Sequence, residues 1–170
     1  MTQRERLAAE IARLRPRAMR GDGSACSNIA VNYRLLGRPR LAFRWWCRGA
    51  SAADGDDFLE VGFCYHHGLG VRRNLSSAAS AYASAVRSAS ITQFGCEEAM
   101  YHWATLLLEK GGPRAHSHAA SLLRRANADQ DYRQARELLN ALESGDQLRI
   151  CSCRRGLKSS IRRVACRVHR

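Results

Sequence analysis

The residues with the clearest potential for chemistry lie near the C-terminus, where three cysteines and a histidine are closely spaced. Cys151 and Cys153 form a Cys-x-Cys pair, and further along Cys166 and His169 form a Cys-x-x-His pair. Three thiolates and one imidazole are a ligand set that tetrahedral zinc accepts. The spacing therefore predicts a structural zinc site. A disulfide or unreactive thiols are the alternatives, because Cys-x-Cys is less usual at such sites than Cys-x-x-Cys.

The same segment, residues 147–170, is a strongly basic tail. It contains no acidic residue and eight basic ones: Arg149, Arg154, Arg155, Lys158, Arg162, Arg163, Arg167 and Arg170. A charge run of this kind favours contact with an acidic partner such as the phosphates of nucleic acid. A bound metal would offset part of the repulsion among the cations. The alternative is a solvated, partly disordered tail.

The whole chain is basic as well, with 28 Lys and Arg against 15 Asp and Glu in 170 residues, a formal net charge of +13. This charge indicates acidic partners without choosing among them. The chain contains no apolar run of signal-peptide or membrane-spanning length, so we expect a cytoplasmic protein without a membrane span. Four of the seven cysteines stand singly among apolar residues and are expected to be small core residues: Cys26, Cys47, Cys64 and Cys96.

Motifs of known enzyme classes are missing from the sequence. His66 and His67 are adjacent, and adjacent helical residues point about 100° apart, so surface imidazoles are expected there and not a metal site. Gly68 and Gly70 indicate a turn, because no phosphate-loop lysine follows them. No paired carboxylates, His-Glu-x-x-His helix or nucleophile elbow occurs. The sequence predicts that the protein is not an enzyme.

The elements that must position these residues are predicted to be helices throughout. Residues 1–20 form a capping helix that Pro16 is expected to end or kink. Residues 21–146 show helical periodicity broken by Gly, Pro and Asp turns, which predicts about three helical hairpins and a closing helix. Residues 147–170 are the tail. The predicted fold class is all-α.

An internal repeat underlies the hairpins. Three helices can be aligned with Ala25, Asp57 and Ala99 as equivalent first positions. In each copy a bulky apolar residue follows after four positions, a small residue comes next, and a larger apolar residue lies three beyond that. The small residues are Ala30, Gly62 and Ala104, which we expect to let two helices approach closely. Such units bury their apolar faces by stacking on their neighbours.

The second copy resembles the Sel-one-like repeat, a relative of the tetratricopeptide repeat. The resemblance lies in the string from Asp57 to Val71, above all its Val-Gly-x-x-Tyr-x-x-Gly-x-Gly-Val portion. It covers roughly residues 18–142, and the third copy matches more loosely. It implies a short right-handed solenoid of stacked helical hairpins. It also implies a non-enzymatic adaptor or scaffold that binds a protein or peptide, and such repeats are widely used by bacteria. An inhibitor or immunity-type protein is one version of this hypothesis.

The resemblance further implies a concave binding groove on the first helix of each pair. The positions that it places there are Val31, Arg34, Leu59, Phe63, His66, Tyr101, Thr105 and Leu108. Aromatic and Arg side chains are typical of binding hot spots, although the same residues would also suit the core between repeats. The alternative function is nucleic-acid association through the basic, zinc-bearing tail. The sequence does not predict the oligomeric state.

Overall fold

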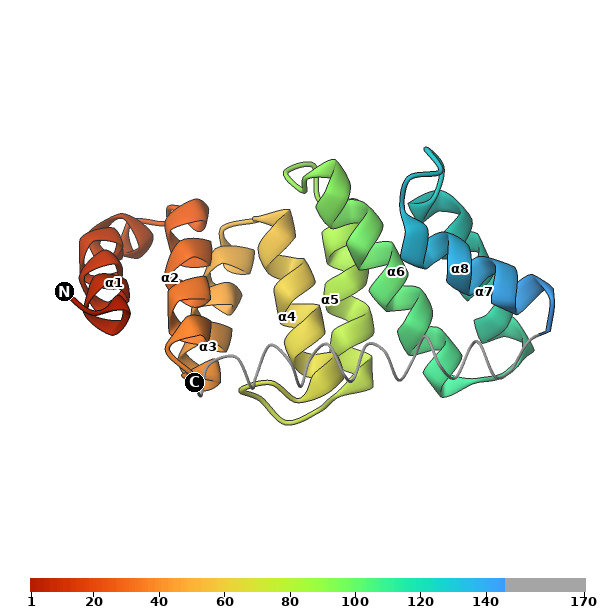
Figure 1. The fold of residues 1–170 in the computed structure, drawn as a ribbon, viewed down its shortest axis with the longest axis horizontal. Coiled ribbons are helices and arrows are strands. Elements are labelled where there is room, and N and C mark those ends of the chain that lie inside the picture. Colours follow the sequence, from red (N-terminus) through yellow and green to blue (C-terminus); the bar gives the residue numbers. More distant parts are fainter. Residues whose placement is uncertain (146–170) are drawn as a thin grey trace. The chain divides into compact units, whose positions relative to one another are not determined.

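The computed structural model describes residues 1–145, and all regular secondary structure in that range is α-helical. The elements are α1 (Gln3–Met19), α2 (Gly23–Leu35), α3 (Pro39–Ser51), α4 (Gly55–His67), α5 (Leu75–Arg87), α6 (Gln93–Lys110), α7 (Pro113–Ala126) and α8 (Arg133–Glu143) (Figure 1). The chain divides into two compact units at Gly95, which are described one at a time. The predicted all-α class is confirmed, and packing of consecutive helices is compatible with a helical repeat.

The helix starts follow from local capping chemistry. Thr2 and Glu5 form a reciprocal capping box at the start of α1, with the Glu5 carboxylate 2.8 Å from the Thr2 backbone nitrogen. Asp22, Asp54 and Asn74 accept hydrogen bonds from the first backbone N–H groups of α2, α4 and α5. Proline stands at the first position of α3 and of α7, where its missing N–H costs nothing.

Of the two effects expected of Pro16, an end or a kink of the first helix, the end does not occur. Helix α1 continues to Met19, and Pro16 lies inside it. Proline removes only one backbone donor, and Ile11, Leu14 and Ala18 still present a buried stripe on both sides of it. Apolar packing in the last turn therefore outweighs the lost hydrogen bond at this position.

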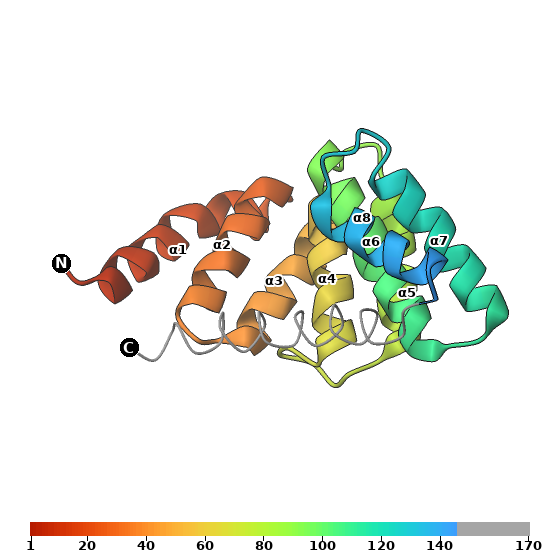
Figure 2. The ribbon, with the colours of Figure 1, turned by 45° about the vertical axis from the view of Figure 1, so that its right-hand side comes forward.

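In the first unit, residues 1–95, each helix packs on the next one, from α1 through α5 (Figure 2). One core cluster joins α1 to α2 and is built around Ile11, Leu14, Cys26 and Ile29. A second cluster lies where α2, α3, α4 and α5 meet: Ala30, Ala42, Trp46, Ala50, Val61, Cys64 and Ala81. The first cluster holds α1 and α2 side by side.

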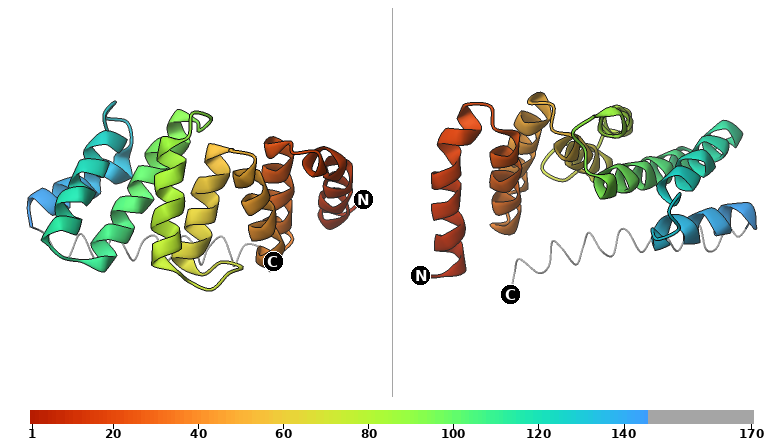
Figure 3. Two further views of the ribbon diagram at one scale, coloured as in Figure 1. Left: turned by 180° about the vertical axis from the view of Figure 1, so that it is seen from behind. Right: turned by 90° about the horizontal axis from the view of Figure 1, so that it is seen from above.

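The small residues of the aligned helices lie in the interior, and Gly62 lies at a close contact between two helices. Ala30, Gly62 and Ala104 are all buried. A Cβ atom on Gly62 would lie 2.6 Å from Cδ1 of Tyr82, whose side chain in α5 is fully buried. This gap lets α4 approach α5, and Figure 3 shows the two helices lying side by side. Gly68 and Gly70 end α4 with positive φ values of 72° and 73°, a backbone conformation that favours glycine.

The second unit begins at Cys96 and includes most of α6 together with α7 and α8. Helices α7 and α8 pack on each other. The ring of Trp103 on α6 contacts that of His118 on α7 with 5.1 Å between centroids. Tyr101 meets Tyr132, the residue before α8, at 5.6 Å. The closing helix predicted from the sequence is α8.

Candidate functional site

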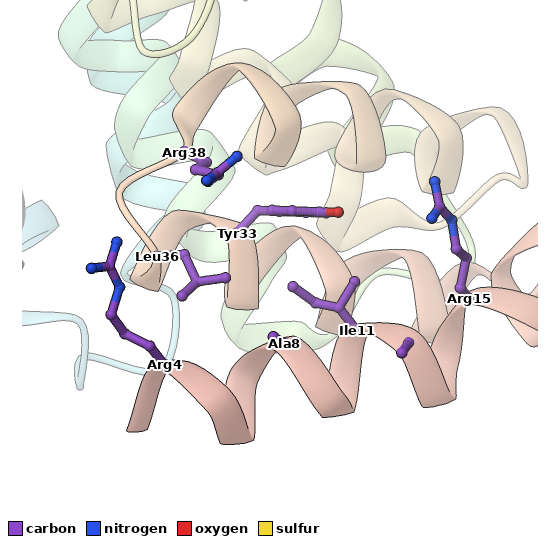
Figure 4. A pocket seen from close by; sticks show the side chains of 8 residues that line it. Arg4, Ala8, Ile11, Arg15, Tyr33, Leu36 and Arg38 are labelled. Atoms are coloured by element: carbon purple, nitrogen blue, oxygen red, sulfur yellow. The ribbon is translucent and has the colours of Figure 1, made fainter. Parts of the chain in front are cut away.

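An open groove lies between α1 and α2 in the first unit and is our candidate binding site. Its cavity volume is about 430 Å³. The residues that line it are Arg4, Ala8, Ile11, Ala12 and Arg15 from α1, Tyr33 from α2, and Leu36 and Arg38 from the turn that leads to α3. Figure 4 shows Ile11, Leu36 and the ring of Tyr33 in the middle of the site, with Arg4 and Arg15 at its two ends.

The sequence of α1 explains how the helix presents two kinds of residue to this groove. Arg4, Ala8, Ile11 and Arg15 recur at helical spacing, so they lie along one side of α1. Ile11 also belongs to the core and is only 7% exposed. The same side of the helix thus carries an apolar centre and a guanidinium group beyond each end of it.

The three arginines of the groove lack acidic partners in the described part of the chain. Their neighbours on α1 are paired: Arg13 lies 2.6 Å from Glu10, and Arg17 lies 2.7 Å from Asp22. Within residues 1–145 no salt bridge involves Arg4, Arg15 or Arg38. A ligand that is both apolar and acidic would bind favourably here, because unpaired cations lie beside an apolar surface.

The concave-groove positions predicted in the first unit make contacts inside the protein. Leu59 is 8% exposed and His66 is 3% exposed, with the His66 Nδ1 atom 3.3 Å from the Tyr82 hydroxyl. Arg34 is half-buried, lies 5.4 Å from the centre of the Trp46 ring, and forms a 3.3 Å ion pair with Glu60.

Val31 and Phe63, also in the first unit, are half-buried, and the Phe63 ring lies 4.4 Å from that of His67. Tyr101, Thr105 and Leu108 are buried and belong to the second unit. These placements are those of core and packing residues, the alternative that the sequence left open. Partner binding by the eight positions stays a prediction.

The α1–α2 groove was not among the sites predicted from the sequence. A signal for it existed, because the apolar stripe of the capping helix is flanked by basic residues at Arg4 and Arg15. The opposite wall of the groove was not predictable, because the positions of Leu36 and Arg38 depend on the conformation of the α2–α3 turn.

A buried carboxyl lies elsewhere in the same unit. Asp57 is 1% exposed, and its Oδ2 atom has no hydrogen-bond partner. Burial raises the pKa of this group to about 8; a hydrogen bond with Ser27 opposes the shift, and nearby carboxylates, first that of Asp54, add to it. Gly49 provides the space for the carboxyl, because a Cβ atom there would overlap it.

The cysteines of the described residues are free, and they do not lie in a cluster of side chains that could bind a metal. Cys26 and Cys64 are buried as predicted, whereas Cys47 and Cys96 are half-buried. Burial raises the pKa of each of these four thiols, which disfavours the reactive thiolate. No group of three His, Cys, Asp or Glu in residues 1–145 is placed to hold a metal ion.

The predicted zinc ligands Cys151, Cys153, Cys166 and His169, and the basic tail, lie outside the described residues. Among the helices of residues 1–145, none is long and apolar enough to cross a membrane. A comparison with models of protein families finds no match, and a search of curated proteins finds no significant relative, so the resemblance to Sel-one-like repeats remains a prediction from the residues themselves.

Proposed function

We propose that this protein is a non-enzymatic adaptor, built from Sel-one-like helical repeats, that binds a protein partner. The observation that carries the proposal is the groove between α1 and α2, with its apolar centre and three arginines that have no acidic partner in the described residues. None of the eight residues lining the groove carries a carboxylate, an imidazole or a thiol. Its chemistry is therefore that of recognition.

The repeat part of the proposal is supported by the burial pattern of the three aligned helices. The first positions, Ala25, Asp57 and Ala99, are each no more than 1% exposed. The last of the four aligned positions is half-buried in each helix: Tyr33, Tyr65 and Leu107. Three of the four aligned positions thus have the same degree of burial in α2, α4 and α6, as a stack of related hairpins requires, and only Trp103 differs, being half-buried where Ile29 and Val61 are buried. A right-handed solenoid is the arrangement that we propose.

A protein partner is favoured over nucleic acid by the composition of the groove. Aliphatic side chains and alanines are half of the eight lining residues, and Tyr33 is the only aromatic residue among them. Nucleic acid binds to rows of cations and stacking platforms. Protein interfaces combine a desolvated apolar centre with a charged rim, which is what the groove offers.

Site-specific photocrosslinking tests the proposal. A diazirine side chain is introduced at Ala8, which lines the groove, and in a matched protein at Ala9, an exposed alanine about 100° further round the helix. In cells that make the protein naturally, we expect a discrete protein adduct from position 8 that is missing from position 9. Equal labelling from both positions, or adducts with nucleic acid alone, would show that the groove does not bind a protein.

A further inference from the structure

We infer that the occupant of the α1–α2 groove is an acidic amphipathic helix of about three turns in the partner protein. The inference rests on the proposed function and goes further, because it states the chemistry of the partner segment. It follows from three properties of the groove: its apolar centre, the distance between its arginines and its lack of acidic groups.

The apolar centre provides a seat for bulky aliphatic side chains. Ile11 and Leu36 face the cavity, and the ring of Tyr33 extends between α1 and the start of α3 (Figure 4). Ala8 and Ala12 keep the α1 side of the groove shallow, so that another backbone can approach it. The volume of about 430 Å³ exceeds what one aliphatic side chain fills. A helix face presenting residues at i, i+3 and i+4 would supply several.

The arginines set the length of the partner segment. Arg4 and Arg15 lie eleven residues apart on α1, which at 1.5 Å per residue places their Cα atoms roughly 16 Å apart. Arg38 stands across the groove on the α2–α3 turn. Carboxylates at both ends of a three-turn helix match the separation of Arg4 and Arg15. A single small anion at one end would leave the other arginine without a partner.

Charge also argues against one other candidate occupant, the chain's own C-terminal segment. Residues 147–170 contain eight basic residues and no acidic one, so they would be repelled by Arg4, Arg15 and Arg38. An acidic segment of another protein gains both the apolar contact and the ion pairs. Exposed ion pairs contribute modestly one by one, so most of the affinity comes from the apolar centre and most of the selectivity from the arginines.

The test uses the full-length protein and fluorescein-labelled synthetic peptides in anisotropy titrations. The first peptide is a helix of about three turns with leucines on one face and glutamates at both ends. A second has the same composition in scrambled order, and a third has lysine in place of glutamate. We expect saturable binding of the first peptide, with affinity at least about tenfold higher than that of the other two.

Two pairs of matched variants locate the binding site. The charge-reversal variant of the groove carries Arg4→Glu, Arg15→Glu and Arg38→Glu, and its control reverses three exposed arginines that do not line the groove: Arg6→Glu, Arg44→Glu and Arg87→Glu. The steric variant is Ala8→Trp, and its control is Ala9→Trp. We expect the groove variants to lose about tenfold or more in affinity and the controls to change less than about twofold. Circular dichroism confirms that each variant is folded.

Three results would overturn the inference. One is equal binding of the ordered and scrambled peptides. Another is equal losses in the groove and control variants. The third is a DNA duplex or anionic vesicles binding at the groove, as shown by the same variants, while the peptide does not. If the peptide fails and the crosslink at position 8 still captures a protein, only the acidic-helix inference is wrong. If no protein is captured, the proposed function fails with it.

Discussion

Asp57 occupies the repeat position that alanine fills at Ala25 and Ala99. All three are buried, so α4 encloses a carboxyl where α2 and α6 enclose a methyl group. Gly49 makes room for the carboxyl and Ser27 partly lowers its pKa, but the Oδ2 atom has no hydrogen-bond partner. A buried group with incomplete hydrogen bonding favours its neutral form, which accounts for the direction of the pKa shift.

Replacing Asp57 by Asn should remove a pH-dependent loss of stability. The pKa of Asp57 is about 8 in the folded protein against an ordinary value of 3.8, so between these values the folded state holds a proton that the unfolded state has released. Stability conferred by the proton therefore falls as pH rises from about 4 to about 8. The difference of roughly four pKa units sets an upper limit of roughly 5 kcal/mol, and we expect roughly 1–3 kcal/mol after partial hydration of the site.

Urea unfolding of both proteins at several pH values measures this effect. The free energy of unfolding of Asp57→Asn, minus that of the unsubstituted protein, should increase steadily from pH 5 to pH 8. The other titrating groups cancel in the difference. A difference that is constant across this range would mean that Asp57 is ionised in the folded state, and the proposed burial effect would be wrong.

At the scale of the helices, contact between α4 and α5 depends on the missing side chain of Gly62. Alanine there gains up to about 1 kcal/mol in helix propensity but places a Cβ atom 2.6 Å from the ring of Tyr82, which is fully buried. Overpacking of this kind costs roughly 1–3 kcal/mol. The clash outweighs the propensity, so we expect Gly62→Ala to destabilise the protein by roughly 1–2 kcal/mol in thermal or urea unfolding.

The sign of this effect should reverse when Tyr82 is also replaced. In a Tyr82→Ala background the clash has gone, and Gly62→Ala should then stabilise α4 by about the propensity difference alone. If Gly62→Ala has the same effect in both backgrounds, contact with Tyr82 is not the reason for the glycine.

The helices were largely predictable because each carries its own periodic signal. The apolar stripes located the helix pairs, and the register correctly identified Ala30, Gly62 and Ala104 as buried small residues. Pro16 does not end α1, one of the two effects expected of it, because the packing of Ala18 two residues further on outweighs the local preference of proline. Local rules fail where a tertiary contact reaches past the breaking residue.

The groove was harder to predict than the helices because it is a property of two helices and a turn. Periodicity shows which face of α1 is apolar, but it does not show which exposed arginines find a carboxylate. Arg13 and Arg17 do so, and Arg4 and Arg15 do not. Whether an arginine finds a carboxylate depends on side chains three to five residues away along the chain. The opposite wall of the groove depends on the path of the chain after Leu35.

At the scale of the whole molecule, the positive charge falls into two parts. The tail, residues 147–170, holds eight of the 28 basic residues, so residues 1–146 hold 20 basic and 15 acidic ones. The groove adds an apolar centre to its cations, whereas the charge of the tail is all of one sign, with eight basic residues and no acidic one. A segment whose charge is all positive suits a polyanion, and such binding falls steeply with salt because counterions are released. The two functions proposed for this chain are thus assigned to different segments.

Selective removal of charge should therefore separate the two activities. Replacing Arg154, Arg155, Arg162 and Arg163 by serine should leave acidic-peptide affinity within about twofold near about 0.15 M salt, because salt screens exposed charges and the apolar centre of the groove supplies most of the affinity. The same variant should weaken binding of a DNA duplex and lower its salt dependence by about 0.9 for each phosphate that is no longer neutralised. The groove variant with Arg4, Arg15 and Arg38 reversed should show the opposite pattern, in anisotropy titrations across a salt series. Should the tail variant lose peptide affinity as strongly as the groove variant, peptide binding would be general charge attraction, and the apolar centre would have no part in it.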